Sequence, residues 1–303
     1  MMVAPYDFQF NPQTAVDNTF QKNLPLSSSD LRRRVLAEYH GMVRLLQRAG
    51  IMVVQLPRRR RGPATPDAVF PNNWLMVDAL GRLVTFPMRA ANRRLECRPR
   101  TAATVLLAHG FEVRQHVALH TIGAAGHALE GTGSMVIDHR LRRIFAALSE
   151  RTQLPALKRF MRKLGYRDAI TFTTRGPLGK AIYHTNVMLS IGDGFAVICP
   201  DCIGDKRQRR HVLGSLAQPT IIELSLSQCL DSFAANLLQL KSSRGNLVTV
   251  LSQRAYLSLN RRQRQQLERH GEVLPVPLST IETIGGGSAR CMMLEIFAPR
   301  HGT

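Results

Sequence analysis

Three consecutive glycines, Gly285–Gly287, lead through Ser-Ala-Arg to Cys291 and then to an apolar stretch. Glycines let a backbone come close to a ligand and aim the next side chain. A thiol at the mouth of such a loop becomes a nucleophile when its surroundings lower its pKa from about 8.5. Because a cysteine in an apolar context is more often a small core residue, Cys291 is a candidate nucleophile that needs partners elsewhere in the chain.

Two further segments offer such partners. His184, in Tyr-His-Thr-Asn, directly precedes a strand-like run, and an imidazole there is a candidate general acid and base for Cys291. Glu130, in Leu-Glu-Gly-Thr-Gly-Ser, precedes another strand-like run and is a candidate partner for a histidine ring or a substrate N–H. Each residue alone has an ordinary structural explanation, so their value depends on whether the fold brings them together.

A third segment contains Asp67 and the run Pro-Asn-Asn73-Trp. Adjacent amides beside the single Trp can hydrogen-bond a planar polar ligand. The same residues are also good turn formers.

The elements that position these residues repeat along the chain. Strand pairs separated by short Gly- or Arg-containing turns, which are typical of β-hairpins, occupy residues 73–88, 134–148, 187–201 and 236–252. Each is followed by a helical segment and a short strand, expected at 111–113, near Tyr166, at 220–227 and at 272–279. A related helix and strand, residues 30–50 and 51–57, come near the start of the chain. The spacing of about 50 to 60 residues predicts stacked or radial repeats.

These repeats predict an α/β fold. We expect five units in a ring of one domain, residues 1–303, with the fifth hairpin formed by residues 6–11 and 291–299. Loops at equivalent repeat positions converge in such a ring, which would gather the candidate site residues at its centre.

In order and residue type, the segments around Asp67–Trp74, Glu130–Ser134, His184–Asn186 and Cys291 resemble the guanidine-modifying (pentein) superfamily, in particular its citrulline-hydrolysing branch. The resemblance covers nearly the whole chain and implies a five-bladed α/β propeller of ββαβ repeats around a central active site.

The resemblance also implies roles. Cys291 would attack the carbon of a guanidinium or ureido group, and His184 would protonate the leaving amine and then activate water. Glu130 would bind substrate nitrogens and hold the histidine ring. Asp67 would contact the amino group of the substrate, and Arg151 would bind its carboxylate, which suits a guanidinium fork.

Asn73 and Asn186 depart from the deiminase pattern, since deiminases have carboxylates at both positions. Two amides remove the counter-charges that a cationic guanidinium needs in a partly dry pocket. A neutral ureido group needs donors and acceptors, and an amide supplies both. Citrulline is therefore the expected substrate, with arginine deiminase or amidinotransferase chemistry as the first alternative. A non-catalytic RNA- or ribosome-binding protein of this fold is a second alternative, which the set of Cys291, His184 and Glu130 opposes.

The net charge of +20 arises from 41 basic and 21 acidic residues, and only six of the basic residues are Lys. The arginines are scattered, with the densest run at Arg58–Arg61, and lack the interleaved aromatics typical of nucleic-acid binding. We expect a small-molecule substrate and no specific nucleic acid. The beginning of the chain has no signal-like pattern and no apolar run reaches eighteen residues, so a cytoplasmic protein without membrane contact is expected. Whether it forms a homodimer is left open.

The cysteines do not predict a cofactor or a disulfide framework. Their number is odd, at five, and Cys199-Pro-Asp-Cys202 is a lone C-x-x-C pair, which is weak evidence for zinc. We expect no metal and no cofactor, and Cys199 and Cys202 to be structural or incidental. The triple glycine also lacks the spacing of a dinucleotide-binding loop.

Overall fold

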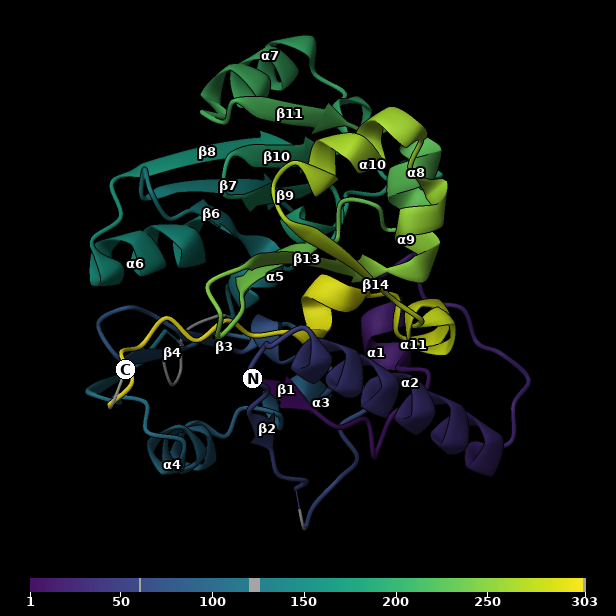
Figure 1. Ribbon diagram of the computed structural model, residues 1–303, viewed down its shortest axis with the longest axis vertical. Coiled ribbons are helices and arrows are strands. Elements are labelled where there is room, and N and C mark those ends of the chain that lie inside the picture. The colour runs from purple at the N-terminus through teal and green to yellow at the C-terminus, as the bar shows by residue number, and fades with distance from the viewer. Residues whose placement is uncertain (60, 120–125, 302–303) are drawn as a thin grey trace.

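The computed structural model describes residues 1–59, 61–119 and 126–301, so Arg60 of the arginine run lies outside the described residues. Within these ranges the chain has a mixed α/β fold, and its strands form four three-stranded sheets and one two-stranded sheet (Figure 1).

Each three-stranded sheet contains one of the predicted hairpins. The first strands are β3 (Leu75–Val77), β6 (Val136–Asp138), β9 (Leu189–Gly192) and β12 (Leu238–Lys241). The second strands, central in every sheet, are β4 (Arg82–Thr85), β7 (Arg143–Leu148), β10 (Phe195–Ile198) and β13 (Leu247–Ser252). Each second strand pairs antiparallel with the first. The hairpin predictions are therefore confirmed for all four ranges.

A third strand in each sheet lies parallel to the central one. These strands are β5 (Gln115–Ala118), β8 (Asp168–Thr173), β11 (Thr220–Glu223) and β14 (Glu272–Val276). Parallel neighbours require a crossover, and the crossovers contain the helices α4 (Pro99–Ala108), α6 (Leu154–Leu164), α7 (Lys206–Ser215) and α10 (Arg261–Glu268). In α6 the buried side chains Ala156, Leu157, Phe160 and Leu164 share one face, as the apolar spacing requires.

One predicted third strand is misplaced. Residues 111–113 do not form the strand expected there, and β5 begins at Gln115 instead. The backbone at Phe111 and Glu112 is already paired with the end of the chain, since Phe111 bridges Arg300 and the Glu112 N–H donates to the Pro299 carbonyl at 2.8 Å.

The fifth unit also differs from the prediction. Residues 6–11 form no strand, and Cys291 and Met292 lie in a short helical turn. Instead β1 (Met2–Val3) pairs parallel with β2 (Gln55–Leu56), and helix α2 (Ser28–Arg48) connects them. Met1 and Leu294 exchange two backbone hydrogen bonds, of 2.6 and 3.0 Å. The two ends of the chain therefore meet, but the N-terminal partner of Leu294 is Met1 rather than residues 6–11.

The remaining helices are short: α1 (Pro12–Ala15), α3 (Ala91–Arg94), α5 (Gly131–Ser134), α8 (Leu226–Leu230), α9 (Gln253–Ser258) and α11 (Ser279–Gly285). Buried apolar side chains between the sheets and helices form the core. Among the described residues, no helix combines the length and apolar character needed to cross a bilayer.

Candidate active site

A short buried turn precedes the first strand of several repeats. These turns are η1 (Pro71–Asn73), α5 and η3 (Thr185–Val187), and a further buried turn, η5 (Ala289–Met292), contains Cys291 but is followed by no strand. Helix α5 packs against η1 and η3, and η1 packs against η5. These contacts bring residues far apart in sequence to one place.

A pocket lies where these turns meet. Five of the predicted site residues line it: Asp67, Asn73, Arg151, His184 and Cys291. The other two, Glu130 and Asn186, contact lining residues directly, Glu130 through His184 and Asn186 through Cys291. The structure thus places all seven predicted residues around one pocket.

The Cys291 thiol is surrounded by amides. Asn236 Nδ2 lies 3.4 Å from Sγ, and Asn186 Nδ2 lies 3.8 Å from it. Asn236 is held in turn, because its Nδ2 also donates to the Asn186 carbonyl at 2.9 Å and its Oδ1 accepts from the Arg290 N–H at 3.1 Å. Burial raises the pKa of the Cys291 thiol, although hydrogen bonds from its surroundings oppose this. Burial therefore favours the thiol form of Cys291 in the ligand-free protein.

His184 is fixed by Glu130. Its Nε2 lies 2.9 Å from Glu130 Oε2, and Glu130 Oε1 accepts from the backbone N–H of Arg89 at 3.0 Å. Burial opposes ionisation of Glu130, but Arg151, His184 and Arg93 hold the pKa of its carboxyl well below the usual range. Since an ionised carboxylate only accepts, His184 Nε2 carries the hydrogen and Nδ1 is left as a base. Burial lowers the pKa of His184 despite this partner.

Gly133 allows α5 to pack closely against the His184 ring. A Cβ on Gly133 would lie 2.4 Å from Asn73 Nδ2 and 2.7 Å from His184 Nδ1. Only glycine leaves room for both groups, which explains its position between Glu130 and the strand.

Asn73 is oriented by an arginine that the sequence analysis missed. Arg93 Nη1 donates to Asn73 Oδ1 at 2.7 Å. A guanidinium only donates, so the amide oxygen faces Arg93 and Nδ2 faces away. The Nδ2 atom is buried and has no hydrogen-bond partner.

Arg93 itself is buried and forms a two-point ion pair with Glu96, through contacts of 3.0 and 2.9 Å. Burial is the largest influence on Glu96 and raises its pKa to about 7 although Arg93 opposes the change. Glu96 follows Arg93 by three residues, just beyond the end of α3, and this spacing was the signal in the sequence. Asn236 had a clearer one, because it precedes the fourth hairpin as Asn73 and Asn186 precede the first and third.

Asp67 has one occupied and one free oxygen. Its Oδ2 accepts from Asn11 Nδ2 at 2.7 Å and from Thr14 Oγ1 at 2.9 Å. Its Oδ1 is buried without a partner. An unpaired carboxylate oxygen beside the pocket fits the predicted contact with an amino group.

Arg151 is paired within the protein. It forms an ion pair with Asp17, donates to the Thr14 carbonyl at 2.9 Å and lies 3.6 Å from Glu130 Oε2. Its guanidinium also stacks 4.9 Å from the centre of the Tyr183 ring. Binding of a substrate carboxylate by Arg151 remains a prediction, and it requires Asp17 to share or release the guanidinium.

The triple glycine packs against protein side chains. Gly286 ends α11 in the left-handed region, with φ of 60°. Its carbonyl accepts from Asn18 Nδ2 at 3.2 Å and from the Tyr183 hydroxyl. The glycines therefore turn the backbone sharply and fix the loop that ends at Cys291.

Comparison with solved structures places this fold among known ones. The N-terminal domain of ArgZ, an arginine dihydrolase from the ornithine-ammonia cycle in Cyanobacteria, has a TM-score of 0.69 at 17% identity, with 99% of this chain and 96% of that chain covered. AgrE in a complex with ornithine and NAD⁺ has a TM-score of 0.70 at 19% identity, covering 99% of this chain but 39% of that chain, so this chain spans about two fifths of AgrE. A dimethylarginine dimethylaminohydrolase adduct has a TM-score of 0.60 at 16% identity, with 87% and 91% covered.

No curated protein sequence matches the chain significantly. The family model described as N,N dimethylarginine dimethylhydrolase, eukaryotic, matches residues 4–298, which is nearly the whole chain. The chain therefore belongs to this family and, with it, to the guanidine-modifying pentein superfamily.

Proposed function

We propose that the chain is a cysteine-dependent hydrolase of the C–N bond in a ureido or guanidino amino acid, with citrulline as its substrate. Cys291 is the nucleophile, His184 the acid and base, and Glu130 the group that holds the histidine. We also propose that the five repeat units are the blades of one propeller domain, with this site at their centre.

The free Nδ2 of Asn73 is the observation that carries the substrate assignment. Arg93 holds the amide oxygen, so Asn73 offers only N–H groups beside His184 Nδ1. A ureido group has a carbonyl oxygen that accepts such a donor. A guanidinium has no acceptor, and it would leave this buried donor unpaired at a cost of about 1–3 kcal/mol.

The cations around the pocket are already paired within the protein. Arg93 lies beside Glu96, Asp67 and Glu130, and Arg151 lies beside Asp17 and Glu130. A neutral ureido group leaves these pairs intact and needs no further counter-charge.

The reaction needs only groups around the pocket. As the Cys291 proton passes to His184, the thiolate attacks the ureido carbon, and the bond from this carbon to one nitrogen breaks. His184 gives the departing nitrogen a proton, and ammonia leaves. Water, activated by His184, then cleaves the thioester-like intermediate, which restores the thiol and yields a carbamate that decomposes to the amine and carbon dioxide.

Arginine-type substrates are the second candidate. The free Oδ1 of Asp67 is an acceptor that could pair with a guanidinium N–H as well as with an amino group. ArgZ is described as an arginine dihydrolase, and the matching family is named for dimethylarginine. Hydrolysis of arginine or a methylated arginine, and amidino transfer, are therefore the alternatives to exclude.

The deciding experiment compares turnover of citrulline, arginine, dimethylarginine and agmatine by the same preparation, with ammonia, ornithine and citrulline quantified separately. We expect ornithine and ammonia from citrulline, and no turnover by Cys291→Ala. Faster turnover of arginine or dimethylarginine would overturn the citrulline assignment, and activity of Cys291→Ala would overturn the covalent mechanism.

A further inference from the structure

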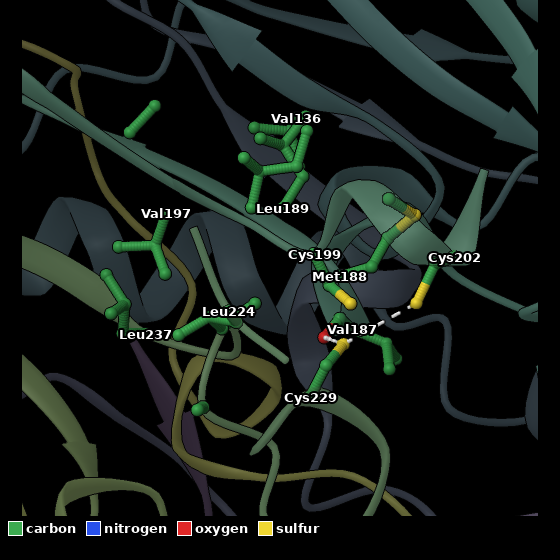
Figure 2. Packing of buried hydrophobic residues seen from close by; sticks show 14 of the residues in the cluster. Val136, Val187, Met188, Leu189, Val197, Cys199, Cys202, Leu224, Cys229 and Leu237 are labelled. Atoms are coloured by element: carbon green, nitrogen blue, oxygen red, sulfur yellow. Dashed lines mark hydrogen bonds between the residues drawn. The ribbon is translucent and has the colours of Figure 1, made fainter. Parts of the chain in front are cut away.

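Three buried cysteines form a cluster outside the proposed active site. Cys199 directly precedes the turn η4 (Pro200–Cys202), and Cys202 is its last residue. Cys229 lies in α8. Figure 2 shows their side chains turned toward one another among apolar residues. All three thiols are free, and one sulfur from each lies within 4.8 Å of the other two.

The spacing of the sulfurs fits a shared metal ion. Three sulfurs about 2.3 Å from one ion, the usual zinc–sulfur distance, lie ~3.8 Å apart in a tetrahedral and ~4.0 Å apart in a planar arrangement. Cys202 Sγ and Cys229 Sγ are 4.0 Å apart. The cluster can therefore accept an ion with small side-chain adjustments. A disulfide, in contrast, needs the sulfurs to close to about 2.05 Å.

We propose that Cys199, Cys202 and Cys229 bind one thiophilic divalent cation of the Zn²⁺ class. Soft thiolates select such ions over Mg²⁺ or Ca²⁺. The carbonyl oxygen of Val187 lies 3.4 Å from Cys229 Sγ, beside the cluster (Figure 2).

A bound ion would stabilise the turn η3, which contains the active-site residue Asn186. Val187 follows Asn186 in η3, and the Cys199 N–H donates to the carbonyl of Met188 at 3.0 Å. A bound cation would tie both contacts to the same three sulfurs. It acts on η3 as a structural ion, without contact to a substrate.

The test uses reduced, chelator-treated full-length protein titrated with Cd²⁺ and with Zn²⁺. We expect one equivalent of Cd²⁺ to bind with a thiolate-to-metal charge-transfer band, and Zn²⁺ to compete for it and to raise Tm. Cys202→Ala and Cys229→Ala should each weaken binding by more than the ~10–100-fold typical of a lost outer contact. Cys97→Ser and Cys291→Ser are the matched controls and should bind as the wild type does.

X-ray absorption on Zn²⁺-loaded wild type tests the proposal without relying on variants that fail to fold. Three sulfur neighbours at about 2.3 Å are expected. Fewer than three sulfur neighbours, no stoichiometric binding by the reduced protein, or loss of the ion in Cys291→Ser would each overturn the proposal.

Discussion

Exchanging the two active-site amides for carboxylates tests the choice between a neutral and a cationic substrate. Asn73→Asp is the informative single change, and Asn186→Asp completes the pair. Arg93 lies 2.7 Å from Asn73 Oδ1, so the new carboxylate keeps a cationic partner and the fold should be preserved. What the change removes is the N–H donor that has no partner in the ligand-free protein.

The expected magnitude follows from that lost donor. If Asn73 Nδ2 donates to the ureido oxygen, its removal leaves a buried acceptor unpaired and costs about 1–3 kcal/mol. This corresponds to about 5–150-fold weaker citrulline binding. Arginine should bind more tightly by about 1 kcal/mol, which is about fivefold in affinity, because Arg93 already neutralises much of the new charge. Adding Asn186→Asp should raise the arginine affinity further.

Isothermal titration in a Cys291→Ala background measures binding without turnover. Citrulline and arginine are titrated into the parent, Asn73→Asp and the double variant at fixed pH and salt. Asn246→Asp is the matched control, since it adds the same charge in the exposed turn between β12 and β13 and does not line the pocket. It should leave the preference for citrulline unchanged.

A parent protein that binds arginine more tightly than citrulline would refute the ureido assignment outright. An Asn73→Asp protein with unchanged citrulline affinity would show that Nδ2 does not contact the ureido oxygen. In the first case the deiminase-type alternative would take its place.

Three further predictions concern the site. Alkylation of Cys291 by iodoacetamide should be slow at neutral pH and should accelerate as the pH rises, because burial raises the pKa of this thiol. The midpoint of the pH profile should lie above that of a free thiol. A midpoint below that of a free thiol would contradict the effect of burial. Asn236→Ala should lower kcat and the Cys291 alkylation rate by about 10–100-fold through loss of a charge-assisted hydrogen bond, whereas Asn260→Ala, which removes a distant helix cap, should affect only stability. Arg151→Ala should raise KM for an α-carboxylate substrate on the order of a hundredfold and change little for its decarboxylated analogue; equal losses on both would assign Arg151 to supporting the fold.

Much of the architecture could be predicted because it depends on local patterns. Alternating apolar residues, short turns and amphipathic helices identified all four hairpins and their crossover helices. The errors occurred where pairing is set by distant residues. Phe111 and Glu112 pair with the end of the chain, and Met1 rather than residues 6–11 pairs with Leu294. No local sequence pattern predicts either pairing.

The same distinction applies to the site. Cys291, His184 and Glu130 stood out because their residue types have obvious chemistry and their segments precede strands. Arg93 did not stand out, since one arginine among so many has no distinguishing context in sequence. Cys229 was missed for a similar reason, because it joins Cys199 and Cys202 only through the packing of α8.

Because the site is assembled from short turns that are far apart in sequence, heating should affect activity and secondary structure differently. The nucleophile, the base and the amide donor lie in or beside three different turns, η5, η3 and η1, so their mutual distances are set by packing between these turns rather than by any single hydrogen-bonded element. Ångström-scale changes in such distances are costly in rate, while each sheet keeps its own hydrogen bonds. We therefore expect catalysis to fade at temperatures where circular dichroism still reports intact secondary structure, and a bound substrate, by spanning the turns, to narrow that gap.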